Sequence, residues 1–217
     1  MTTLIDSICL GFSVYPFFFI LFALPIFVAT VIRYKAINLM RIALHDIFLL
    51  YFICVVTLVL FPLPTMEQAA ALNGYRIQWI PFHVVMDIIK ESKLQISQPI
   101  TYVKELFNPA LLQMLFNVLL TVPFGMFLAY YYGMDKKKVI LASFLLSFII
   151  EITQLTGIYG IYKGSYRICD VDDLMTNTLG GLVGFQIIAR FGKMLPVLSR
   201  YDIKVERAHA HVRQEVR

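Results

Sequence analysis

Long apolar runs alternate with shorter polar connections along the chain, which has 217 residues. A helix needs about 20 apolar residues to cross the hydrocarbon core of a bilayer, and five runs come close to that length. They cover residues 10–32, 43–61, 109–131, 139–158 and 172–190, and the last is short and rich in glycine. The pattern predicts an all-α fold, an integral membrane helical bundle with about five transmembrane helices.

The segment between the second and third runs, residues 62–108, predicts an amphipathic interfacial helix. Its stretch IQWIPFHVVMDIIKES has an apolar helical face with Phe82, Val85, Met86 and Ile89, and a polar face with His83, Asp87, Lys90 and Glu91. Aromatic side chains favour the headgroup region, so the candidate interfacial residues are Trp79, Pro81 and Phe82. Two interpretations stay open. The helix packs on the outer ends of the spans, or it forms a lid or surface that touches outer-leaflet lipid.

Composition agrees with a membrane protein. The chain is 59% hydrophobic and 15% charged, whereas a soluble domain is nearer half apolar and a quarter charged. Three cysteines give neither a disulfide framework nor the spacing of a metal site. The first run is too long for the apolar core of a signal peptide, so we expect it to be retained. We divide the chain into a first span with a cytoplasmic loop (1–41), a membrane domain (42–192) and a basic cytoplasmic tail (193–217).

The basic residues are unevenly distributed among the connections. The connections 33–42 and 132–138, together with the segment from residue 190 onwards, hold 13 of the 19 Lys and Arg residues. Because basic residues tend to stay on the cytoplasmic side, this predicts an N-terminus outside and a C-terminus in the cytoplasm. These segments explain the net charge of +5. We therefore expect membrane lipid, and no nucleic acid, as a partner.

Polar and small residues recur at helical spacing within the third, fourth and fifth runs. The three stripes are Gln113, Asn117, Thr121 and Gly125; Ser143, Ser147, Glu151 and Gln154; and Asp173, Asn177, Gly180 or Gly181, and Gly184. The larger polar groups lie toward the predicted outer end and the small residues toward the inner end. Small residues allow close helix packing, so the candidate packing positions are Gly125, Ser143, Ser147, Gly180, Gly181 and Gly184. The stripes predict a cup that is closed on the cytoplasmic side and polar on the outer side.

Glu151 is the strongest candidate for a functional residue. A charged residue at the centre of a span costs about 2.5–3.5 kcal/mol on insertion scales, so such residues usually have a function. Its carboxyl group could pair with Arg167, or it could take part in a structural hydrogen bond with Asn117 or Asn177. With the polar groups expected around it, the residue forms a candidate polar cluster. This polar cluster comprises Asn117, Glu151, Gln154, Arg167, Asp170, Asp172, Asp173 and Asn177.

The acids at the start of the fifth run admit several roles. Asp172 or Asp173 is the expected N-cap of the last helix, where a carboxylate also complements the helix dipole. Asp170, Asp172 and Asp173 beside Glu151 could also bind a divalent cation through oxygen ligands, hold Arg167, or bind a cationic ligand. We assign no metal ligands and expect no other cofactor, since the sequence DVDD lacks a strict ligand spacing.

Four stretches within residues 77–185 form a recognisable set, namely IQWIPF, LFNVLLTVPFGMFLAYY, SFIIEITQLTGIYG and RICDVDDLMTNTLGGLVGF. Together they resemble the VanZ-like family of small bacterial membrane proteins. The motif positions are Pro81, Phe82, Asn117, Pro123, Gly125, Ser147, Glu151, Gln154, Arg167, Asp170, Asp173, Asn177, Gly180 and Gly181. The resemblance implies a VanZ-like domain over residues 42–192 of a bacterial plasma-membrane protein. It also implies a link to low-level resistance to teicoplanin, a lipidated glycopeptide antibiotic that acts at the outer leaflet on the cell-wall precursor lipid II.

Three functions stay open. The first, which we favour, is a non-enzymatic envelope protein whose polar cluster interacts with a lipid-linked cell-wall precursor or a lipoglycopeptide, so that less drug reaches its target. The second is a membrane-embedded enzyme that acts on a lipid headgroup, with Glu151 and an aspartate as acid and base or as metal ligands. The third is a small transporter or flippase subunit that works as half of a homo-oligomer, with Gly180 and Gly184 at the dimer face.

Overall fold

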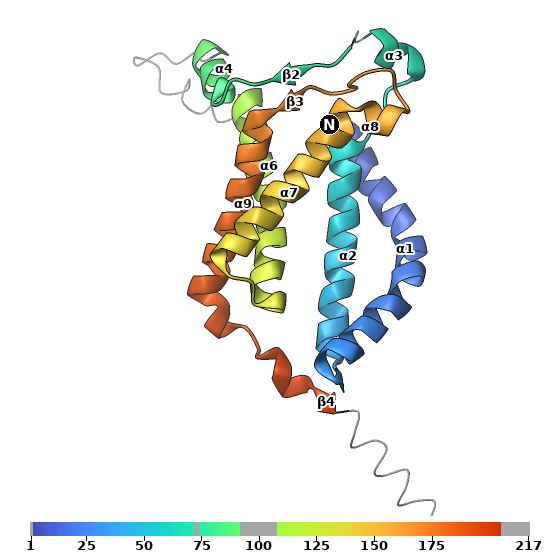
Figure 1. Cartoon of the computed structure of the whole chain (residues 1–217), viewed down its shortest axis with the longest axis vertical. Helices are drawn as coiled ribbons and strands as arrows, with labels where there is room; N and C mark the ends of the chain where they lie inside the picture. Colours follow the sequence, from blue (N-terminus) through green and yellow to red (C-terminus); the bar gives the residue numbers. More distant parts are fainter. Residues whose placement is uncertain (1, 72–73, 92–107, 205–217) are drawn as a thin grey trace, which may run out of the picture. The chain divides into compact units, whose positions relative to one another are not determined.

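The computed structural model describes residues 2–71, 74–91 and 108–204, which belong to two compact units (Figure 1). Unit 1 comprises Met1–Pro62 and Lys193–Arg217, and unit 2 comprises Leu63–Gly192. The elements of unit 1 are α1 (Thr2–Tyr34), β1 (Ala36–Ile37), α2 (Leu39–Leu60), η2 (Leu198–Tyr201) and β4 (Ile203–Lys204), and η1 (Gly192–Met194) connects the units along the chain. Those of unit 2 are α3 (Met66–Ala71), β2 (Ile77–Gln78), α4 (His83–Glu91), α6 (Pro109–Tyr132), α7 (Lys136–Leu155), α8 (Gly157–Gly160), β3 (Cys169–Asp170) and α9 (Val171–Phe191).

Four helices of the described chain, α1, α2, α6 and α7, are long and apolar enough to cross a membrane. They confirm the all-α membrane fold. The fifth predicted run forms α9, a helix of 21 residues that is less apolar because it carries Asp172, Asp173 and Asn177. α7 ends at Leu155 rather than at the predicted residue 158, because the backbone turns into α8 through positive φ angles at 157–159.

α9 packs against both α6 and α7 in unit 2, and glycines set its distance from α6. A Cβ atom added at Gly125 would overlap the backbone of Gly181, and one added at Gly180 or Gly184 would overlap the backbone of α6. Because the two helices approach backbone to backbone, a larger residue does not fit at these positions. The face of α9 that carries Gly180 and Gly184 is therefore covered within the chain, and it is not the dimer face considered above.

The amphipathic segment is shorter as a helix than its sequence pattern suggested. α4 begins at His83, whereas Ile77–Gln78 forms β2 and pairs in parallel with β3. Pro81 disfavours a helical conformation at the residue before it, and Phe82 has a positive φ of 62°. These two features prevent an earlier start of the helix. The predicted polar face of α4 includes the side chains of Lys90 and Glu91, which lie outside the described part of the structure.

Unit 1 contains a helical hairpin in which α1 and α2 pack side by side (Figure 1). Gly11 of α1 lies against Cys54 and Thr57 of α2, where an added Cβ atom would be tightly crowded. The Tyr15 hydroxyl donates a hydrogen bond to the Asp46 carboxylate at 2.6 Å. The hairpin thus combines close packing with a side-chain hydrogen bond between its two apolar helices.

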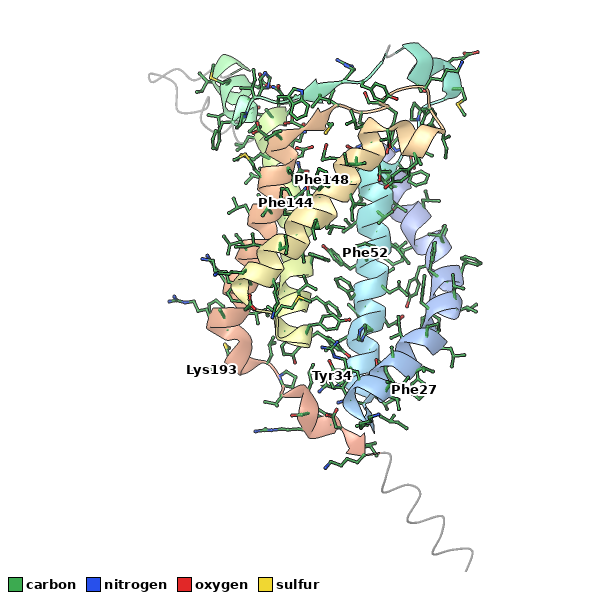
Figure 2. All side chains as sticks on the ribbon, viewed as in Figure 1. Phe27, Tyr34, Phe52, Phe144, Phe148 and Lys193 are labelled. Carbon is green, nitrogen blue, oxygen red and sulfur yellow. The ribbon has the colours of Figure 1, made fainter. Side chains whose placement is uncertain are left out.

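The tail segment, residues 193–204, folds back onto the connection between α1 and α2. Its strand β4 pairs antiparallel with β1. Asn38 is completely buried and donates to a backbone carbonyl of η2 at 2.7 Å and to the Asp202 carboxylate at 2.6 Å. Arg41 Nε lies 3.1 Å from Asp202 Oδ1, and the guanidinium group stacks over the ring of Tyr34, labelled in Figure 2. The first part of the basic tail is therefore a folded element of unit 1.

Asp202 is stabilised in its charged form by this contact. Burial alone would raise the pKa of Asp202, but hydrogen bonds from Arg41 and Asn38 outweigh that effect and hold the pKa below its ordinary value. The rest of the predicted tail, residues 205–217, lies outside the described residues.

Large apolar side chains cover outward surfaces of the long helices. Phe27 of α1 and Phe144 and Phe148 of α7, all labelled in Figure 2, are exposed. α6 exposes a row of side chains at helical spacing, namely Leu112, Leu115, Phe116 and Leu119. Apolar surface of this extent is unfavourable in water, and it is expected where membrane helices face lipid.

The contact between Gly181 and Ser143 can be tested by a pair of substitutions. Gly181→Ala should lower the free energy of unfolding by about 1–3 kcal/mol, the usual cost of overpacking, because the added Cβ would overlap the Ser143 side chain. Adding Ser143→Gly should restore part of this loss, although glycine itself costs a helix about 1 kcal/mol. Thermal unfolding in detergent micelles measures both changes.

Gly125→Ala is the matched control for this pair. Its Cβ would meet the backbone of Gly181 rather than a side chain, so Ser143→Gly should give no rescue. Equal rescue of the two glycine variants would contradict the packing described for α9.

A second prediction concerns Asp202→Asn, which removes the charge beside Arg41. The variant should unfold more easily at neutral pH, by about 1–3 kcal/mol, because the buried guanidinium loses its charged acceptor. The folded pKa of Asp202 lies below the unfolded value of about 3.9. The charged Asp202 therefore contributes fully to the free energy of unfolding above its unfolded pKa, and this contribution is lost as the pH falls through its folded pKa. The difference in thermal unfolding temperature between wild type and Asp202→Asn should therefore become smaller below about pH 4. A difference that stays constant in acid would contradict the role of the Asp202 charge.

Candidate functional site

Polar side chains of α6, α7 and α9 meet in a hydrogen-bonded group that we call the three-helix network (Asn117, Thr121, Ser147, Asp173 and Asn177). Asn117 Nδ2 donates to Asp173 Oδ1 at 2.6 Å, and Asn177 Nδ2 donates to the Ser147 hydroxyl at 3.0 Å. The Thr121 hydroxyl donates to the backbone carbonyl of Asn177 at 2.8 Å. The stripes expected from the sequence thus face one another, and each of these five side chains bonds a neighbouring helix. Ser143 of the α7 stripe is also buried, but its hydroxyl has no hydrogen-bond partner in the described structure.

Glu151 on α7 is almost completely buried, with 3% of its surface exposed. Its Oε2 atom accepts the backbone N–H of Asp170 at 3.0 Å, and its carboxyl group also forms a hydrogen bond with the Cys169 side chain. Both partners belong to β3. Glu151 therefore ties the end of α7 to the strand that leads into α9. These partners differ from the Arg167, Asn117 and Asn177 considered for Glu151 above, because a backbone N–H leaves no signal in the sequence.

The chemistry of Cys169 follows from this position. Burial, followed by the adjacent charge of Glu151, raises the pKa of the Cys169 thiol to about 11. At neutral pH the side chain is a thiol, which is a much weaker nucleophile than a thiolate. Burial likewise raises the pKa of Tyr166 to about 12. These two groups therefore stay protonated at neutral pH and are not poised for nucleophilic attack.

Asp170, Asp172 and Asp173 each accept hydrogen bonds from a different part of the structure. Asp170 is the N-cap of α9, since its side chain accepts the backbone N–H of Asp172 at 2.8 Å. The expected cap at Asp172 or Asp173 is thereby corrected. Asp172 instead accepts the backbone N–H groups of Phe82 and Val84 at 2.6 and 2.7 Å and so caps the neighbouring helix α4. Asp173 faces the three-helix network.

A small pocket of about 70 Å³ lies between α4, α6 and the start of α9. Its lining consists of His83, Val84, Asp87, Ala110, Gln113, Met114, Asp170, Asp172, Asp173 and Thr176. His83 Nδ1 lies 2.8 Å from Asp87 Oδ2. Burial raises the pKa of Asp170 above its ordinary value, although the hydrogen bond from Asp172 opposes that effect. A volume of this size holds a few water molecules or one small polar group.

Most members of the polar cluster come together at this end of unit 2. Asn117, Asp173 and Asn177 belong to the three-helix network, and Gln154 is buried on α7 beyond Glu151. Arg167 is exposed on the segment before β3. The expected interfacial residues, Trp79, Pro81 and Phe82, are all exposed. Within the described chain, no group of three or more His, Cys, Asp and Glu side chains is placed to hold a metal ion.

Several lining residues are not members of the polar cluster expected from the sequence. His83 and Asp87 belong to the polar face of the amphipathic helix, and their spacing of four residues is a usable signal for a polar contact. Met114 and Thr176 carried no such signal. They line the pocket because of where α6 and α9 lie in the bundle.

Comparisons with known proteins identify a family for the chain. None of the curated proteins and none of the solved structures matches the chain. A family model described as VanZ/LLP1 matches residues 48–192, which is more than half of the chain and includes α6, α7, α9 and the pocket. The chain belongs to the VanZ/LLP1 family.

Proposed function

We propose that this chain is a protein of the bacterial cell envelope that lowers susceptibility to teicoplanin and related lipoglycopeptides. In this proposal the polar cluster faces outward and interacts with the polar part of a lipid-linked or lipidated molecule, so that less drug reaches its target. The observation that carries the proposal is the three-helix network with its adjoining pocket. Membership of the family supports the choice of drug class.

The distribution of charge supports an outward-facing pocket. α6 ends and α7 begins beside the lysines of residues 136–138, whereas the pocket lies at the opposite end of α6. Basic connections tend to stay in the cytoplasm, so the pocket end would be outside. The same rule would place the N-terminus outside and the C-terminus in the cytoplasm.

The lining of the pocket supports a particular kind of contact. Four carboxyl groups, one imidazole and one amide contribute to it, from Asp87, Asp170, Asp172, Asp173, His83 and Gln113. Carboxylates are hydrogen-bond acceptors. Such a lining therefore favours an amine or hydroxyl group and disfavours a phosphate, which would meet like charge. The pocket is far below the roughly 300–1,000 Å³ of a drug-sized site, so only one polar group of the bound molecule would enter it.

The packing of α9 supports binding rather than passage through the bundle. Gly125, Gly180 and Gly184 bring α6 and α9 into backbone contact on the side of the network away from the pocket. A polar path between these two helices would need space there. A binding site that is open at one end suits an envelope protein that sequesters or shields its ligand.

The proposal predicts that the charge of the polar cluster is needed for protection against teicoplanin. We would express wild type, Glu151→Gln and Asp173→Asn at matched membrane levels in a susceptible host that lacks the gene. Wild type should raise the inhibitory concentration, and both variants should lose most of this effect. Asparagine at position 173 keeps an oxygen acceptor in the pocket lining but removes the charge, and losing a charge-assisted hydrogen bond weakens binding by about tenfold or more. Glutamine at position 151 weakens the acceptor of the Asp170 backbone N–H and should displace Asp170, which lines the pocket.

Asp135→Asn provides the matched control for these substitutions. Asp135 is exposed at the N-cap of α7 and bonds the backbone N–H of Lys138, and asparagine is an equally good N-cap. This variant should protect as well as wild type. Equal protection by all four proteins would show that the polar cluster is structural, and no protection by wild type would overturn the proposed function.

A further inference from the structure

Helix α4 has two chemically opposite faces, and the described side chains of its polar face lie against the pocket. His83 and Asp87 line the pocket from this helix. At 3.6 residues per turn, the opposite face carries Val85, Met86 and Ile89, which are all exposed. A surface helix on a soluble protein is arranged the other way, with its apolar face toward the core.

Asp172 fixes this orientation of α4. Its two carboxylate oxygens accept the N–H groups of Phe82 and Val84, and the residue is only 4% exposed. Turning α4 to bury its apolar face would break both bonds and leave a buried carboxylate without these donors. That loss is costly. The outward apolar face is therefore a stable feature of unit 2.

Exposed apolar side chains also occur just before α4 and on α6, against which it packs. Trp79 and Phe82, just before the helix, are 69% and 61% exposed. α4 also packs against α6, which is long and apolar enough to cross a membrane. α6 carries its own exposed row, Leu112, Leu115, Phe116 and Leu119. α4, with its exposed apolar face, thus packs against a helix that is long and apolar enough to cross a membrane.

We infer that membrane lipid covers the apolar face of α4, and that the pocket behind this helix is reached from the bilayer rather than from water. α4 acts as an interfacial helix at the boundary between headgroups and acyl chains. Its apolar face contacts acyl chains, while its polar face holds the pocket open to a polar group at headgroup depth.

This arrangement defines the class of ligand. The ligand is a membrane-resident amphiphile whose polar group enters the pocket while its acyl chain remains among the lipids beside α4 and α6. The ligand class rests on the proposed function of the pocket, whereas the position of α4 rests on its own geometry. Because the pocket holds only one small group, the acyl chain supplies the remaining binding energy by staying in the bilayer.

Trp79 is the only tryptophan of the chain, so its fluorescence reports on this segment alone. We would reconstitute the full-length protein in phosphatidylcholine vesicles and compare quenching by aqueous iodide with quenching by lipids brominated at different depths. Bromine near the top of the acyl chain should quench Trp79 most strongly, and iodide should quench it weakly. Strong iodide quenching with no effect of brominated lipid would overturn the inference.

Charged substitutions on α4 supply the second measurement. Met86→Asp and Ile89→Asp should raise iodide quenching of Trp79 by about twofold or more, because a charge on the apolar face expels the helix from lipid. Ile203→Asp is the matched control, since Ile203 is an exposed isoleucine of β4 in unit 1. It should leave Trp79 unchanged. Equal effects of the three substitutions would overturn the inference.

A photoreactive lipid tests the route to the pocket. Phosphatidylethanolamine with a diazirine in its acyl chain should label residues 79–89 together with the exposed row of α6. Labelling of the membrane helices without residues 79–89 would overturn the inference. These readouts are independent of drug susceptibility. A lipid-quenched Trp79 with no protection by wild type would remove the proposed function alone, and a water-exposed Trp79 with protection by wild type would remove this inference alone.

Discussion

The contact between the backbones of α6 and α9 is the constraint on which unit 2 depends. At Gly125, Gly180 and Gly184 there is no room for a side chain between the two helices. In lipid the hydrophobic effect gives little drive for helix association, so close packing and interhelical hydrogen bonds must supply it. The glycines bring α9 near enough for Thr121 to reach the carbonyl of Asn177. The same approach brings Asp173 to Asn117.

The concentration of acids at the start of α9 follows from this packing. Three separate structures need an acceptor at nearly the same place: the first turn of α9, the first turn of α4, and the amide of Asn117. Asp170, Asp172 and Asp173 serve them in that order. Glu151 adds an acceptor for the backbone of β3. Each carboxylate therefore has a structural donor, and the site combines a rigid frame with an acceptor-rich pocket.

Much of this arrangement could be predicted from the sequence, because two signals are strong. Runs of about 20 apolar residues mark membrane helices, and polar residues four apart mark the faces that meet, as they do at Asn117 and Asn177. Three features could not be predicted. The pairing of β2 with β3, and with it the partner of Glu151, depends on backbone groups that every residue has. The cap was expected at Asp172 or Asp173 rather than at Asp170, because neighbouring acids cap equally well. The role of Asp172 on α4 depends on contacts 88 and 90 residues apart.

The tail segment gives unit 1 an unusual connectivity. Asn38 and Arg41 are buried near the beginning of the chain, but their partners in η2 and at Asp202 follow 160 or more residues later. During synthesis the α1–α2 hairpin is complete in sequence long before those partners leave the ribosome. Until the last helices have been made, the side chains of Asn38 and Arg41 must form these hydrogen bonds with water or lipid headgroups instead. The first hairpin therefore gains its last hydrogen bonds only when residues 198–202 have been made. Unit 1 can fold completely only after all the helices between the hairpin and this segment have been translated and inserted.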